Sequence, residues 1–283
     1  MNPLTHSYYS GASDAQIIYE TIGTYFDKIA DVHNTNPALV VRHQGVNWTY
    51  GELQARVDRL ATGLIHLGIK PGDRVGIWGP NSSEWVLVQL ATAKIGAIMV
   101  CINPAYRLYE LEYALNKVEC KTLITDVSFK TSDYLGMINT LAPELESSHP
   151  GQLVAEKLPH LKHVIRMGSD TTPGMYNFDA VCTAGTADDQ ATMDTLQARL
   201  QPDDAINIQF TSGTTGNPKG ATLSHCNILN NGFLTGLAMQ LGPEDKLCIP
   251  VPLYHCFGMV LSVLACVSHG ATMVFPGPSF DPE

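Results

Sequence analysis

Hydrophobic positions in the first half of the chain follow a helical period in some stretches and form short continuous runs in others. Between residues 53 and 67 they fall on one helical stripe, made by Leu53, Val57, Leu60, Ala61, Leu64 and Leu67. Thr49 and Glu52 precede the stripe at capping-box spacing, and Gly68 follows it. We therefore predict a helix that starts after Thr49 and stops at Gly68.

The remaining apolar runs are short and typical of strands. They predict strands at residues 38–43, 46–50, 74–78, 97–103, 121–126, 163–167 and 205–210, with helices at 81–96 and 107–117. The runs at 97–103 and 121–125 do not alternate, as expected for strands that are covered on both faces. The repeated strand–helix order predicts an α/β fold of mainly parallel sheets flanked by helices.

The pattern weakens between residues 127 and 204, where polar residues predominate. We interpret the stretches 147–151 and 182–194 as surface connections. The 283 residues are expected to form part of one large domain, with a first α/β portion at 1–203 and a second portion at 204–283.

One apolar segment, residues 257–275, is barely long enough to cross a bilayer. Ser262, Ser268, His269 and Gly270 interrupt it, which disfavours a transmembrane helix. A buried helix that stops at Gly270 and leads into a buried strand explains the pattern better, so we expect no transmembrane segment.

Charge and cysteine content narrow the class of protein. The net charge of −10 and the pI of about 5.4, without a lysine- and arginine-rich run, argue against nucleic-acid binding. Seven cysteines without a Cys-x-x-Cys pair, behind an N-terminus that lacks a secretory signal, predict reduced thiols in the cytoplasm. Cys248 and Cys256 flank His255 at a spacing that fits no zinc site, so we expect no metal there.

The stretch FTSGTTGNPKGATLSH, residues 210–225, concentrates glycine, hydroxyl side chains and one lysine after a strand. Glycines let backbone N–H groups converge on a bulky anion, hydroxyls add donors, and a lysine adds a mobile positive charge. We predict a phosphate-binding loop between a strand and a helix that begins at Thr222, Ser224 or Asn227. Its candidate residues are Thr211, Ser212, Gly213, Thr214, Thr215, Gly216 and Lys219.

Two alternatives explain this loop less well. A flexible surface loop would account for the glycines, but not for the clustered hydroxyls or for Lys219. A Walker-type P-loop requires Ser or Thr after Gly-Lys, whereas Pro218 precedes Lys219 here and Gly220 follows it.

The motif FTSGTTGNPKG resembles the phosphate loop of the adenylate-forming superfamily, which includes acyl-CoA synthetases, luciferases and peptide-synthetase adenylation domains. Residues 49–53, 103–116 and 252–260 resemble the same family. The combination of INIQFTSGTTG with NPAYR is most similar to the medium-chain fatty acyl-CoA synthetases.

The resemblance implies a two-step reaction. A carboxylate attacks the α-phosphorus of ATP to give an acyl-adenylate and pyrophosphate, and the thiol of coenzyme A then displaces AMP. The loop at 211–219 would hold the β- and γ-phosphates, with Mg²⁺ offsetting their charge, and Lys219 would act in catalysis through positioning and charge.

His255 has two interpretations. From the residues alone it is a core histidine bonded to backbone, whereas the resemblance places it beside the acyl and adenylate site as a second catalytic residue. The stretch YHCFGMV contains no acid to pair with a substrate ammonium, which favours a fatty acid over an amino acid. Phe257, Met259 and Val260 are expected to contact the acyl chain.

Further motifs of the family, a Tyr-Gly-x-Thr-Glu stretch, a ribose-binding aspartate and a C-terminal lysine, do not occur in these residues. We therefore expect the N-terminal portion of such an enzyme, inactive by itself and prone to self-association through uncovered apolar faces. Two alternatives stay open: a non-catalytic nucleotide-binding or interaction fragment, and an adenylation module that serves a carrier protein.

Overall fold

The computed structural model describes residues 15–211 and 216–280. Its α-helices are α1 (Ile22–Val32), α2 (Tyr50–His66), α3 (Ser83–Ile95), α4 (Leu108–Lys117), α5 (Tyr134–Leu141), α6 (Phe178–Ala184), α7 (Ala187–Gln197), α8 (His225–Met239), α9 (Cys256–Gly258) and α10 (Ala265–His269). The other helical turns are the 3₁₀ segments η1 (Arg42–Gln44) and η2 (Pro143–Glu146) and the π-helix η3 (Met259–Leu264). The strands are β1 (Pro37–Val41), β2 (Val46–Thr49), β3 (Arg74–Trp78), β4 (Ile98–Ile102), β5 (Thr122–Thr125), β6 (Ser128–Phe129), β7 (Ser132–Asp133), β8 (His163–Arg166), β9 (Tyr176–Asn177), β10 (Ala205–Phe210), β11 (Gly220–Ser224), β12 (Lys246–Cys248) and β13 (Thr272–Phe275).

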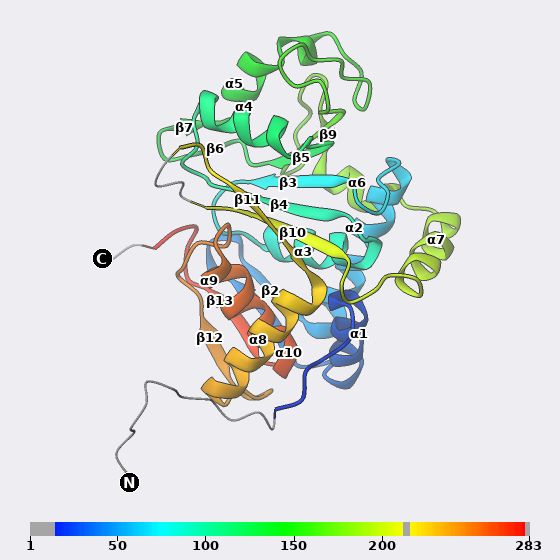
Figure 1. Ribbon diagram of the computed structural model, residues 1–283, viewed down its shortest axis with the longest axis vertical. Coiled ribbons are helices and arrows are strands. Elements are labelled where there is room, and N and C mark those ends of the chain that lie inside the picture. The colour runs from blue at the N-terminus through cyan, green and yellow to red at the C-terminus, as the bar shows by residue number, and fades with distance from the viewer. Residues whose placement is uncertain (1–14, 212–215, 281–283) are drawn as a thin grey trace, which may run out of the picture.

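A seven-stranded sheet occupies the upper half of the molecule in Figure 1. Its order is β11-β10-β4-β3-β5-β8-β9, and every neighbouring pair is parallel except β10 with β11. The strands predicted at 74–78, 97–103, 121–126, 163–167 and 205–210 all belong to it. The predicted α/β fold with mainly parallel strands is therefore confirmed.

A second sheet, of order β12-β13-β1-β2, lies in the lower half. In it β1 pairs in parallel with β13, with Leu39 opposite Met273 and Val41 opposite Phe275. Both sheets thus combine strands from before and after residue 204. The portions 1–203 and 204–283 share both sheets, and a boundary between them stays a prediction.

Helix α2 begins as the sequence predicts. The Thr49 hydroxyl accepts a hydrogen bond from the Glu52 N–H at 3.2 Å, and the Glu52 carboxylate accepts one from the Thr49 N–H at 2.9 Å. This reciprocal capping box satisfies two N–H groups at the helix start. Leu53, Val57 and Leu60 of the predicted stripe are fully buried.

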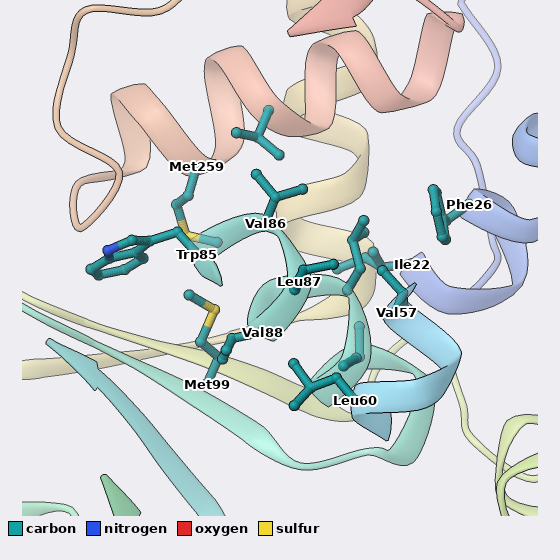
Figure 2. Packing of buried hydrophobic residues seen from close by; sticks show 14 of the residues in the cluster. Ile22, Phe26, Val57, Leu60, Trp85, Val86, Leu87, Val88, Met99 and Met259 are labelled. Atoms are coloured by element: carbon teal, nitrogen blue, oxygen red, sulfur yellow. The ribbon is translucent and has the colours of Figure 1, made fainter. Parts of the chain in front are cut away.

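Helix α3 is buried on all sides, with only Glu84 outside the core. Figure 2 shows its residues Trp85–Val88 beside Met259, from the helical segment above, and Met99, from β4 below. A helix that is buried on every face takes such a position between two layers.

The polar stretch 182–194 is not a surface connection, so that interpretation is wrong. Cys182 lies in α6, and most of the remainder forms α7, which buries only Met193. A helix with so little apolar surface shows no 3.6-residue pattern. The sequence signal for the start of α7 was the spacing of Thr186 and Asp189. The Thr186 hydroxyl caps the helix by accepting from the Asp189 N–H at 3.3 Å.

The apolar segment 257–275 consists of α9, η3, α10 and β13, with Gly270 at φ +71° between α10 and β13. The predicted buried helix, Gly270 stop and buried strand are confirmed, although the helix contains a π-helical stretch. Among the described residues no helix is both long and apolar enough to span a bilayer.

A buried ion cluster joins α1, α2 and α3. The Lys94 side chain is 2% exposed, and its Nζ lies 2.5 Å from an Asp27 carboxylate oxygen and also contacts Asp58. The Asp27 carboxylate accepts further bonds from the side-chain amides of Gln54 and Gln197. Removing the cation would leave two carboxylates close together without a counter-charge.

We predict that Lys94→Ala lowers the free energy of unfolding by about 3–5 kcal/mol, because the variant leaves a buried charge pair broken. Urea unfolding followed by circular dichroism measures this change. The control is Lys28→Ala, whose exposed ion pair with Glu20 should contribute less than about 1 kcal/mol. Equal effects of the two variants would contradict a stabilising role for the buried cluster.

Candidate functional site

The candidate site lies where β4 and β10 end, at the carboxyl edge of the seven-stranded sheet. The two strands pair in parallel, with Met99 opposite Asn207 and Cys101 opposite Gln209. The residues that follow them, Asn103 and Thr211, therefore reach the same edge, which is where open α/β sheets bind ligands. A cavity of about 640 Å³ opens here, lined by Cys101, Asn103, Tyr106, Gln209, Phe210, Thr211, Pro218, Ala221, Leu223, Tyr254, His255 and Cys256.

The predicted phosphate loop is the turn of a β-hairpin. The Thr211 N–H donates to the Lys219 carbonyl at 2.9 Å, and Phe210 pairs with Gly220 in antiparallel register. Strand β11 thus separates the loop from α8, so the expected strand–loop–helix order is wrong. The glycine and hydroxyl pattern that suggests a phosphate loop gives no sign of this short strand.

Helix α8 starts after Ser224, one of the three residues considered from the sequence. The Ser224 hydroxyl accepts from the Asn227 N–H at 3.2 Å, and the Asn227 side chain accepts from the Ser224 N–H at 3.0 Å. The start of α8 is therefore fixed by its own cap, and it lies beside Ala205, at the end of β10 away from the loop.

Not all of the predicted loop residues fall within the described chain. Ser212, Gly213, Thr214 and Thr215 lie outside the described residues. Thr211 lines the cavity, whereas Gly216 and Lys219 are exposed and are not among its described lining residues. Gly216 has φ +150°, a conformation that favours glycine.

Two tyrosines of α4 support the second half of the loop. The Tyr109 hydroxyl lies 3.4 Å from the Asn217 side-chain oxygen, and the Tyr113 hydroxyl donates to the Pro218 carbonyl at 3.2 Å. The stretch 103–116 thus contributes to the site by holding the loop. Sequence reasoning identified this stretch by resemblance but assigned it no role.

His255 lies at the N-cap of α9 and lines the cavity together with Thr211. Its Nδ1 accepts a hydrogen bond from the Phe257 N–H at 3.1 Å, so the neutral ring carries its proton on Nε2. The side chain is exposed, so the interpretation as a core histidine is wrong, although its bond to backbone is present. It therefore offers one N–H donor at the cavity.

The chain before His255 is clamped by Asn81 at the start of α3. The Asn81 amide donates to the Val251 carbonyl at 2.9 Å, and its oxygen accepts from the Leu253 N–H at 2.8 Å. After His255, the π-helix η3 begins at Met259, and π-helical turns are frequent at functional sites. The position of His255 is thus fixed on both sides.

The expected acyl-chain contacts of Phe257, Met259 and Val260 stay a prediction. Both are buried, and neither is among the described residues that line the cavity. Phe257 is 54% exposed and also lies outside that lining set. Apolar surface is instead supplied by Phe210, Ala221 and other lining residues that sequence reasoning did not select.

Gln209 and Cys101 are the buried members of the lining. The Gln209 amide nitrogen lies 3.1 Å from the Asn207 side-chain oxygen, 3.1 Å from the Cys101 sulfur and 2.8 Å from the Met259 sulfur. Burial raises the pKa of the Cys101 thiol to about 12, so it stays protonated and unreactive near neutral pH. The sequence indicates this cluster, because Asn207 and Gln209 are polar residues in the otherwise apolar strand INIQF.

A second cavity, of about 370 Å³, adjoins the first, since Asn103 and Tyr254 line both. Two cationic side chains, Arg107 and Lys130, lie on its wall. The Arg107 guanidinium donates to the Thr131 hydroxyl at 3.2 Å. This wall is suited to an anionic ligand.

Acidic side chains are absent from the described lining of both cavities. Across residues 15–211 and 216–280, no three or more His, Cys, Asp and Glu side chains gather as metal ligands would. All seven cysteines are free.

Comparison with known proteins gives relatives that include acyl-CoA ligases and synthetases. The chain is 44% identical over 280 residues to the rat medium-chain acyl-CoA ligase ACSF2, mitochondrial, covering 97% of this chain and 45% of that protein. It is 41% identical over 268 residues to the putative acyl-CoA synthetase YngI of Bacillus subtilis (strain 168), covering 95% and 49%. The chain thus spans about half the length of the curated relatives it matches.

Solved structures share the fold. The anthranilate CoA ligase AuaEII in complex with anthranoyl-AMP superposes with a TM-score of 0.77 at 24% identity, over 95% of this chain and 47% of that one. The N-terminal domain of FACL13 from Mycobacterium tuberculosis gives a TM-score of 0.75 at 25% identity, over 93% and 58%. The model of the AMP-binding enzyme family matches residues 26–283, so the chain belongs to that family.

Proposed function

We propose that this chain is the N-terminal portion of an ATP-dependent acyl-CoA ligase that activates a fatty acid, of medium chain length, as its acyl-adenylate. The observation that carries the proposal is that Thr211, at the start of the phosphate loop, and His255 line the same cavity. The start of the proposed phosphate loop and the His255 N–H donor thereby lie in one cavity with the apolar residues Phe210, Ala221 and Leu223. The names of the curated relatives support the same activity.

In the first step a carboxylate oxygen attacks the α-phosphorus of ATP, and the bond to pyrophosphate breaks. The loop at 211–219 holds the β- and γ-phosphates, and Lys219 follows them with its mobile charge. The His255 Nε2–H donates to an oxygen of the acid or of the adenylate. These groups act by positioning and by stabilising charge. Mg²⁺ belongs to the proposal as a counter-ion of the phosphates, and no step is assigned to it.

In the second step the sulfur of coenzyme A attacks the acyl carbonyl, loses its proton and displaces AMP. Arg107 and Lys130 supply charge for the phosphates of coenzyme A in the second cavity. Because Asn103 and Tyr254 line both cavities, the thiol has a short path to the adenylate.

The substrate is an acid without an amino group. No carboxylate lines the described part of the cavity, so a bound ammonium would be desolvated without a partner. Phe210, Ala221 and Leu223 provide apolar surface for an aliphatic chain.

Compartment and assembly remain proposals. Free cysteines support the cytoplasm, although the names of the ACSF2 relatives place those proteins in mitochondria. Leu234, Leu237 and Met239 of α8 are exposed apolar residues that support self-association.

We predict that Lys219→Ala, in enzyme of full length, lowers ATP–pyrophosphate exchange about ten- to a hundredfold through loss of a charge-assisted hydrogen bond. Exchange of labelled pyrophosphate at subsaturating ATP measures the effect. Lys246→Ala, an exposed lysine on β12, is the matched control and should leave exchange unchanged. Normal exchange by Lys219→Ala would remove this lysine from the phosphate site.

The substrate class is tested by release of AMP from full-length enzyme supplied with ATP, Mg²⁺, coenzyme A and a panel of acids. Fatty acids should be activated and amino acids of similar length ignored, since no described side chain of the cavity neutralises an ammonium. A preference for an amino acid would overturn the proposed substrate. Adenylation without transfer to coenzyme A would favour an adenylation module that serves a carrier protein. Absence of any adenylation would favour a non-catalytic nucleotide-binding fragment.

A further inference from the structure

The cavity beside His255 has two buried residues in its lining. Of its lining residues only Cys101, 1% exposed, and Gln209, 7% exposed, are buried, whereas all the others are half-buried or exposed. The two residues lie side by side because they are register partners near the ends of β4 and β10. These two side chains therefore form the floor of the cavity.

The Gln209 side chain is held firmly in this floor. Its amide nitrogen contacts the Asn207 oxygen and the sulfurs of Cys101 and Met259 at 2.8–3.1 Å. Met259 is itself fixed, since it is 1% exposed and its carbonyl accepts from the Gln89 amide at 3.0 Å. Displacing the Gln209 amide would leave the buried Asn207 oxygen without this donor, which is costly.

A linear chain that enters from the His255 side gains contact with each added methylene until it reaches the floor. The fixed amide then blocks further entry, because it gives way only with loss of its hydrogen bonds. The Gln209 side chain packs against the buried side chain of Met259, whose sulfur lies 2.8 Å from the Gln209 amide nitrogen. Removing the Gln209 side chain would thus extend the cavity inward.

We propose that Gln209 sets the maximum length of acyl chain that the site accepts. This role rests on the proposed function, since it requires the acid to occupy this cavity. It makes Gln209 a specificity-determining residue through the bulk and rigidity of its amide, with no part in the reaction itself.

The experiment measures binding of straight-chain acids of increasing length to the 283-residue chain by isothermal titration calorimetry, below the concentration at which each acid aggregates. Affinity should rise about fourfold per methylene while the chain fills apolar surface, and should stop rising at a defined length. In Gln209→Ala this break should move to acids about two methylenes longer. The melting temperature of each variant shows that it is folded.

Gln209→Met is the matched control, because it keeps the length of the side chain and removes its amide. Its break should move by less than that of Gln209→Ala, because the bulk remains while the fixing hydrogen bonds are lost. A break that moves as far as in Gln209→Ala would overturn the role of bulk, and one that does not move would overturn the role of rigidity. A break unchanged in Gln209→Ala would overturn the proposal and leave the proposed function standing. Failure of every acid to bind would overturn the acid site itself and this inference with it.

Discussion

The parallel pairing of β10 with β4 is the constraint on which the candidate site depends. The chain leaves β4 at Ile102 and returns at Ala205 to lie beside the same strand, with Gln209 opposite Cys101. Because parallel strands end at one edge, this pairing brings Thr211 to Asn103. This pairing therefore fixes where the predicted phosphate loop begins relative to Asn103.

The same pairing connects the loop to His255. Gln209 precedes the loop by two residues and contacts Met259, which follows His255 by four. Asn81 of the buried helix α3 region holds the chain on the other side of His255. The predicted phosphate loop and the histidine are thus positioned by one connected set of buried contacts.

Local features of the fold could be predicted, whereas its long-range pairings could not. The cap at Thr49 and the apolar runs at 74–78 and 97–103 carry their signals in adjacent residues. The pairing of β1 with β13 joins residues more than two hundred positions apart, and no local pattern encodes it. Helix α7 escaped notice because it buries only Met193.

The site shows the same division. Its glycine-rich motif pointed to Thr211, for which a phosphate role is proposed, and a resemblance pointed to His255. The support from Tyr109 and Tyr113, the clamp by Asn81 and the floor at Gln209 depend on tertiary contacts between distant segments. Polar residues inside an apolar strand, as at Asn207 and Gln209, are the one sequence signal that marks such a cluster.

We propose that one cavity holds both the phosphates of ATP and His255. The most direct measurement is the nuclear magnetic resonance spectrum of ring-labelled histidines in the 283-residue chain during titration with ATP and Mg²⁺. The His255 ring signals should shift with ATP, whereas those of His66, an exposed histidine at the end of α2, should not. Saturable ATP binding that leaves the His255 signals unmoved would contradict the account.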